Sequence, residues 1–219
     1  MSFPIASKLP GGGHVDHVVL GVPDTDQAAD DLASSFGLRP SVSEIGGSDY
    51  PTRSGSLGLG GGSFFELYGP NPTYDGPPHV LRDLLVGLPE PRLLTFMVRV
   101  SDLPGAIERL SSHGHRVAPM LTEWERTNAP SFRNAQFTDH ALDPAVPRLI
   151  EWNDRRGMDD RFVQGVTLAR LTARTEDHDR VRDIHHLLGL DDAEEVRLED
   201  GPPGLTAELE TPNGLVSVS

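Results

Sequence analysis

The chain has 219 residues, 37% of them hydrophobic and 24% charged, which is typical of an ordinary globular protein. A net charge of −14 excludes partners that need a basic surface, so we expect neither nucleic acid nor a membrane surface. The absence of cysteine excludes disulfides, thiolate nucleophiles and thiolate metal sites. With no signal-peptide pattern and no long apolar run, we expect a cytoplasmic protein.

A block of four features recurs three times along the chain: an alternating strand, a polar cap, an amphipathic helix and a closing glycine. The copies are Val15–Val22 with Asp24 and Gly37, Leu93–Val100 with Asp102 and Gly114, and Val166–Ala173 with Thr175 and Gly189. The closing glycines lie about 75 residues apart, so each copy is a small module rather than one turn of a solenoid.

In the first copy, the strand from Val15 leads to a helix that Asp24 or Thr25 can cap and that Gly37 ends. Strands are then expected at Ser41–Ile45, Ser56–Leu59 and Ser63–Tyr68. The glycines at 60–62 predict a hairpin turn, because a strand and not a helix follows them.

A proline-rich linker, Gly69–Pro91, contains one short helical segment within Val80–Leu88. The second copy continues with a helix after Asp102 and strands near 116–120, 135–138 and 148–152. The third has a helix near 177–188, and Pro212-Asn213-Gly214 predicts a final hairpin between strands 205–211 and 215–219.

These elements predict an α+β fold of repeated βαβββ modules at residues 14–70, 92–155 and 163–219. One such module leaves one face of a curved sheet uncovered. We therefore expect the first two modules to pair into a cup-shaped mixed sheet around a cavity, with the third module appended.

Counting seven residues back from each cap compares the first strands of the modules. The count reaches His17, Thr95 and Leu168. The last strands align as Phe65-Glu66-Leu67, Ile150-Glu151-Trp152 and Val216-Ser217-Val218. The first two modules are therefore polar at positions predicted to face the cavity, and the third is not.

Glu66 and Glu151 each stand between apolar neighbours in the middle of a strand, where an unpaired carboxylate is costly to bury. Such a pair needs a common partner, which is a metal ion, a shared proton or the water of an open cleft. One imidazole and two carboxylates suit Zn, Ni, Mn, Co or Fe, with water or substrate oxygens in place of a ligand at Thr95.

The chain resembles the vicinal oxygen chelate superfamily, in particular its three-module glyoxalase-like branch. The residues that carry the resemblance are Asp16–Leu20, Phe65–Leu67, Arg99–Leu103, Leu149–Trp152 and Leu209–Gly214. It implies metal ligands at His17, Glu66 and Glu151, with Thr95 where many members have a second histidine. The superfamily includes lyases, isomerases, epimerases, dioxygenases, thiol transferases and metal-free drug-binding proteins, so the fold does not settle the chemistry.

Our favoured hypothesis is a divalent-metal-dependent lyase, isomerase or dioxygenase-type enzyme that acts on a small vicinally oxygenated substrate. Glu66 or Glu151 would be the catalytic base. One alternative is a metal-free small-molecule binding protein of the same fold. Another is a structural protein in which the third module covers a sheet edge or supports a homodimer.

Other residues are assigned from their positions in the predicted elements. Phe64, Tyr68 and Met97 are expected to line the cup, and His140 to enter it from a loop. His185 and His186 lie on the last predicted helix, where we expect them to face solvent.

Overall fold

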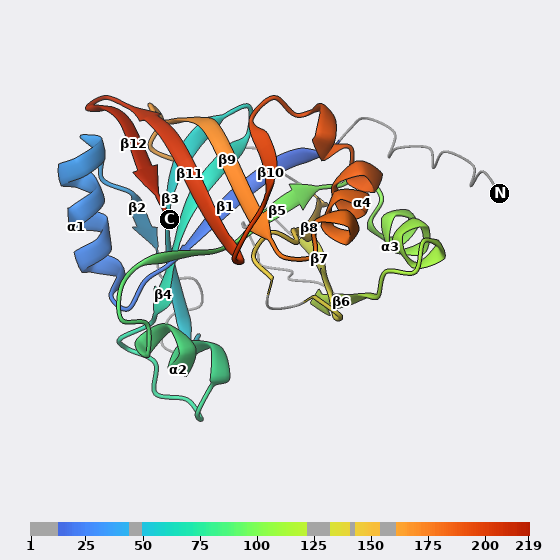
Figure 1. Ribbon diagram of the computed structural model, residues 1–219. Coiled ribbons are helices and arrows are strands. Elements are labelled where there is room, and N and C mark those ends of the chain that lie inside the picture. Colours follow the sequence, from blue (N-terminus) through green and yellow to red (C-terminus); the bar gives the residue numbers. More distant parts are fainter. Residues whose placement is uncertain (1–12, 44–49, 122–131, 141–142, 154–160) are drawn as a thin grey trace. The chain divides into compact units, whose positions relative to one another are not determined.

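The computed structural model describes residues 13–43, 50–121, 132–140, 143–153 and 161–219. Its elements repeat the succession strand, helix and three strands three times, with an additional helix α2 (Val80–Val86) after the first (Figure 1). The predicted α+β class is therefore confirmed.

The chain packs as two compact units, which do not follow the repeat. Unit 1 includes the described residues of 1–16, 95–156 and 170–205, and unit 2 those of 17–94, 157–169 and 206–219. The module boundaries drawn from the repeat stay a prediction.

In unit 2, four strands follow the order β2-β3-β4-β1, and β1 is parallel to β4 while the other pairs are antiparallel. Their bounds are β1 His14–Gly21, β2 Ser41–Ser43, β3 Thr52–Gly60 and β4 Ser63–Pro70. Helix α1 (Thr25–Phe36) buries its apolar side, and Phe36 packs against Phe65 of β4. This face of the strands is therefore apolar core.

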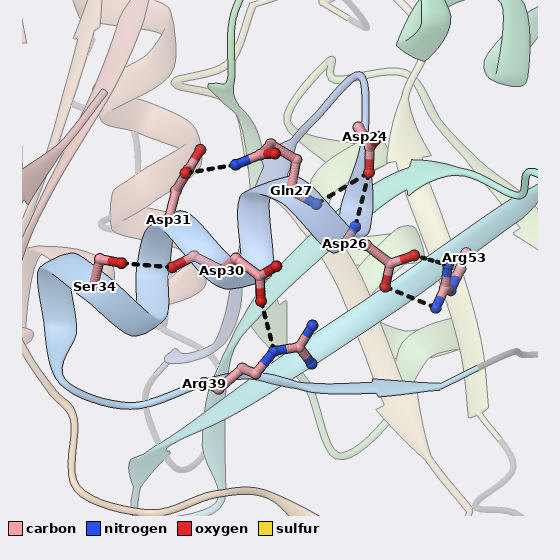
Figure 2. Close-up of polar contacts among 8 residues, drawn as sticks. All are labelled: Asp24, Asp26, Gln27, Asp30, Asp31, Ser34, Arg39 and Arg53. Carbon is pink, nitrogen blue, oxygen red and sulfur yellow. Dashed lines mark hydrogen bonds and ion pairs between the residues drawn. The ribbon is translucent and has the colours of Figure 1, made fainter.

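The limits of α1 follow the predicted cap and stop. Figure 2 shows the cap at Asp24. One oxygen of Asp24 accepts hydrogen bonds from the backbone N–H groups of Asp26 and Gln27, which lack partners within the helix. Gly37 ends the helix with a φ of 77°, a left-handed conformation that favours glycine. Arg53 of β3 then holds the first turn through two hydrogen bonds of 2.7 and 3.0 Å to Asp26.

The predicted C-terminal hairpin is present as β11 (Gly204–Thr211) and β12 (Gly214–Val218), which pair antiparallel. Its turn lies against the end of α1, where Asn213 Nδ2 donates to the carbonyls of Ser34 and Ser35 at 3.2 Å each. A turn residue of the third repeat thus satisfies two carbonyls at the end of the first helix. This contact explains why the last strand belongs to unit 2.

In unit 1, the strand order is β5-β8-β7-β6, with β5 parallel to β8 and the other pairs antiparallel. The strands are β5 Arg92–Arg99, β6 Val117–Leu121, β7 Phe132–Phe137 and β8 Arg148–Trp152. Helix α3 (Leu103–Ser112) begins after Asp102, whose side chain accepts from Gly105 N as predicted. The described core of this unit includes Phe96, Val98, Leu110 and Leu149.

The third repeat begins with β9 (Thr167–Thr175), continues with α4 (His178–Leu188) and returns as β10 (Val196–Asp200), parallel to β9. The prediction that Thr175 caps α4 is wrong, because the cap position is Asp177. Thr175 ends the strand instead, and its hydroxyl donates to Asp143 and accepts from Asp177 N. Counting seven residues back from Asp177 makes Arg170, not Leu168, the counterpart of His17.

None of the helices that the structure describes combines the length and apolar character of a membrane span.

Candidate functional site

His17 and Glu66 lie on the same face of unit 2, as predicted. In the parallel pairing of β1 and β4, His17 is opposite Phe64 and Val19 is opposite Glu66, so the two polar side chains are diagonal neighbours. His17 Nε2 and Glu66 Oε2 are 3.6 Å apart. The side chains are only 8% and 17% exposed, which places an imidazole and a carboxylate together in a poorly hydrated environment.

Aromatic rings fix the orientation of His17. Its ring stacks on Phe64 with a centroid distance of 4.3 Å, and Phe64 stacks in turn on Phe162 at 4.8 Å. Phe64 and Tyr68 alternate with Phe65 and therefore share the face of Glu66, as their predicted role as lining residues requires. Whether these two residues line a cavity stays a prediction.

In the second module, Thr95 and Met97 lie on one face of β5, and both are buried. The Thr95 hydroxyl donates to the carbonyl of Phe96 at 3.3 Å. Parallel pairing sets Met97 opposite Arg148 and Val98 opposite Leu149. The face of Thr95 therefore continues on β8 with Arg148 and not with Glu151.

The register corrects the alignment of the last strands. Val19 lies five residues before the cap of α1 and is opposite Glu66, while Met97 lies five before the cap of α3 and is opposite Arg148. Arg148 is thus the counterpart of Glu66, and sequence alignment missed it. Leu149 and Ile150 are both buried, so the alternation within β8 gave no signal for which face is which.

Glu151 lies on the opposite face from Thr95, at the beginning of α3. Its Oε2 accepts from the backbone N–H of Leu103 at 2.9 Å and from Arg133 Nη2 at 2.6 Å. A carboxylate is favoured there because the first N–H groups of a helix have no partner within it and carry partial positive charge. These contacts support a structural role for Glu151, and metal ligation by Glu151 stays a prediction.

A second buried carboxylate, Asp16, lies beside His17 in the sequence and belongs to unit 1. It is fully buried, and its Oδ2 accepts from Arg99 Nε at 2.7 Å and from Trp152 Nε1 at 3.0 Å. This network ties the start of β1 to β5 and β8. The sequence gave no signal for it beyond an acidic residue within a strand pattern.

The two histidines of α4 differ in burial. The prediction that His185 faces solvent is wrong, because it is 4% exposed, contacts the edge of Phe96 and hydrogen-bonds through Nε2 to the carbonyl of Ala145. Burial lowers the pKa of His185, so it is neutral at pH 7 and donates this bond. His186 is half-buried and pairs with Asp191.

His140 follows β7, and its carbonyl accepts from Asp143 N. Among the described residues its buried Nε2 has no hydrogen-bond partner. Its predicted entry into a cavity stays a prediction. No three His, Asp or Glu side chains of the described segments form a group that could hold a metal ion.

Comparison with known proteins places these observations in a family context. Residues 15–188 match the model of a family described as the glyoxalase-like domain. No curated protein matches the sequence at a significant level. Among solved structures, a hypothetical protein from Staphylococcus aureus has a TM-score of 0.60 at 10% identity, with 87% of each chain covered. Methylmalonyl-CoA epimerase from Mycobacterium tuberculosis has a TM-score of 0.47 at 22% identity, covering 72% of this chain and 97% of its own.

Proposed function

We propose, because the chain belongs to the glyoxalase-like domain family, that it is an enzyme acting on a small molecule with oxygens on neighbouring carbons. The observation that carries the proposal is the buried pair of His17 and Glu66, 3.6 Å apart on one face of unit 2. An imidazole held beside a carboxylate in a poorly hydrated environment is an arrangement typical of acid–base chemistry and of metal ligation.

A divalent ion fits this pair. Two ligand atoms about 2.1 Å from one tetrahedral ion are about 3.4 Å apart, close to the separation of Nε2 and Oε2. The separation is also longer than a direct hydrogen bond. We propose His17 and Glu66 as the two protein ligands of the ion, with water or substrate oxygens completing its coordination. A bound ion would polarise a substrate carbonyl.

The side chains have separable tasks in this proposal. The stack on Phe64 and Phe162 holds the plane of His17, so that Nε2 stays directed at Glu66. Glu66, displaced from the ion, would be the base that takes a proton from a substrate carbon beside the carbonyl. Its low exposure keeps water from competing for that proton.

A metal-free small-molecule binding protein is the second candidate, and specific observations favour it. Arg148 occupies the position in the second module that corresponds to Glu66, and a guanidinium has no lone pair to offer a metal. Glu151 meanwhile points to the start of α3. In this candidate, His17 and Glu66 bind the ligand without an ion.

Metal binding separates the two candidates. Purified chain would be stripped with a chelator, and its melting temperature followed during titration with Zn, Mn, Co, Ni or Fe(II). The enzyme proposal expects saturable stabilisation by at least one ion, reduced more than tenfold in affinity by His17→Gln or Glu66→Gln. Glu210→Gln, an exposed acid of β11 in the same unit, is the matched control. No saturable stabilisation by any of these ions would contradict metal dependence and leave the binding protein.

A further inference from the structure

We propose that residues 162–164, the strap, are a movable cover of the His17–Glu66 pair that opens to admit the ligand. Phe162 is the residue whose displacement uncovers His17. The inference rests on the proposed function only in taking His17 and Glu66 as the place where the ligand binds. It adds how the ligand reaches them.

A backbone contact attaches the strap to the edge of β3. Val163 forms an isolated parallel bridge with Leu57, and Gly58 N donates to the carbonyl of Val163 at 2.9 Å. Strand β2 pairs with β3 at Ser54–Ser56, so the strap lies along β3 beyond the end of that pairing. An isolated bridge lacks the neighbouring ladder bonds of a paired strand, so it can open without global unfolding.

Phe162 places an aromatic ring against the site. Its ring stacks on Phe64 with a centroid distance of 4.8 Å and an interplanar angle of 25°. Phe64 also stacks on His17, at 4.3 Å and 17°. Since one face of a phenyl ring has room for a single stacked ring, Phe64 lies between His17 and Phe162. The strap therefore holds Phe64 against the imidazole.

Gly58 explains why the strap, and not β3 itself, supplies this support. Gly58 is directly opposite Phe64 in the register of β3 and β4, and it has no side chain to pack on the Phe64 ring. A Cβ atom at Gly58 would be 2.3–2.6 Å from the side-chain amide of Gln164, so the strap fills the space above the glycine. When the strap moves away, Phe64 can rotate into that space and away from His17.

A glycine follows the strap directly. Gly165 has a φ of 122°, in the left-handed region that favours glycine. Hinge residues absorb changes in backbone dihedral angles, and glycine has the widest choice of such angles. Strand β9 begins two residues later, at Thr167. The strap can therefore move about Gly165 without disrupting β9.

The burial of the pair requires such an opening. The side chains of His17 and Glu66 are 8% and 17% exposed with the strap in place. Two protein ligands leave positions on a tetrahedral ion for water or substrate oxygens. Those oxygens need space beside Nε2 of His17, and rotation of Phe64 provides it. Closure over the bound ligand would then exclude bulk water, as lids do in other enzymes.

Hydrogen exchange of the wild-type chain, followed for single amides by NMR, tests the opening. The Gly58 N–H loses its partner when the strap leaves β3. The Val22 N–H, bonded to the carbonyl of Tyr68 at 3.0 Å in the same unit, keeps its partner. We expect the protection factor of Gly58 to be at least tenfold lower than that of Val22. Equal protection factors would overturn the inference, because the strap would then open only when unit 2 unfolds.

The reactivity of His17 tests what the opening uncovers. Diethyl pyrocarbonate modifies accessible imidazole nitrogens, and fragment-ion mass spectrometry locates the modification at His17. We expect Phe162→Ala to react there at least fivefold faster than wild type, because Phe64 loses its support. Phe132→Ala, which removes a half-buried ring packed on Trp152 in unit 1, is the matched control and should react as wild type does. An unchanged rate in Phe162→Ala would contradict the strap.

Phe162→Leu keeps an apolar side chain but removes the stack, and it replaces Phe162→Ala if that variant does not fold. We expect at least a twofold faster reaction of His17 in this variant, and an unchanged rate would again contradict the strap. Neither measurement contains a metal ion. Exchange and reactivity as expected, without stabilisation by any ion, support the strap and contradict only metal dependence. Saturable metal binding with equal protection of Gly58 and Val22 contradicts only the strap.

Discussion

The contacts of Glu151 predict that its charge stabilises unit 1, whatever else it binds. Glu151→Gln keeps the size of the side chain and an acceptor for Leu103 N, but it removes the charge beside the helix start and the ion pair with Arg133. A charged acceptor strengthens a hydrogen bond by about 1 kcal/mol, and the helix terminus adds about 0.5 kcal/mol. Arg133 is 35% exposed, so we assign the ion pair only about 0.5 kcal/mol.

We therefore expect Glu151→Gln to lower the free energy of unfolding by about 2 kcal/mol. For a chain of this length that is a melting temperature about 4–8 °C lower. Urea unfolding followed by far-UV circular dichroism measures the loss. Glu199→Gln, an exposed acid of β10 in the same unit, is the matched control.

A double-mutant cycle with Arg133→Met isolates the pair. The two substitutions should be less than additive by about 0.5 kcal/mol, because each removes the same interaction. An unfolding free energy for Glu151→Gln within about 0.3 kcal/mol of wild type would refute the structural assignment. If that variant also lost metal affinity, Glu151 would be a ligand and not a helix-stabilising group.

Three further predictions concern other parts of the chain. Asn213→Ala removes both hydrogen bonds to the end of α1, so it should lower the free energy of unfolding by about 1 kcal/mol. Urea titration measures this change, and an unchanged unfolding midpoint would contradict the contact. Burial lowers the pKa of His185 in the folded chain. Below the ordinary histidine pKa of about 6.5, the unfolded chain therefore binds more protons than the folded chain. The free energy of unfolding falls as the pH drops through that value. Between pH 7.5 and pH 5.5, His185→Gln should lose less unfolding free energy than wild type does. Equal losses would exclude His185 as the source of the pH dependence. Asp16→Asn should lower the free energy of unfolding by about 3 kcal/mol, because it weakens the buried network with Arg99. The unfolding midpoint measures this loss. A loss below about 1 kcal/mol would show that the charge of Asp16 is unimportant for stability.

Part of the candidate site could be predicted because it depends on short-range patterns. Asp24 fixes where α1 begins, and counting back from it locates His17 on its strand. In β4, fully buried Phe65 and Leu67 alternate with Phe64, Glu66 and Tyr68. This alternation shows which face of β4 is apolar core. The pairing of His17 with Glu66 follows from these two local facts and a parallel neighbour.

The second module lacked that contrast. Leu149 and Ile150 are adjacent in β8 and both are buried, so both faces of the strand are apolar at this point. A one-residue change in register moves every side chain to the other face, and sequence alternation cannot detect it here. Glu151 was aligned with Glu66 for this reason, while the pairing of Met97 with Arg148 gives the true correspondence.

By itself, the amino-acid sequence determined the features that form within a few residues of one another. These are the caps at Asp24 and Asp102, the left-handed glycines after α1 and α4, the Asn213 turn and the three strand–helix successions. Only the tertiary structure decided which residues far apart in sequence share a face or a hydrogen bond, among them Arg148 as counterpart of Glu66 and the burial of His185. The physical reason is that caps and turns satisfy backbone groups locally, whereas register is set by packing on both faces of a strand at once.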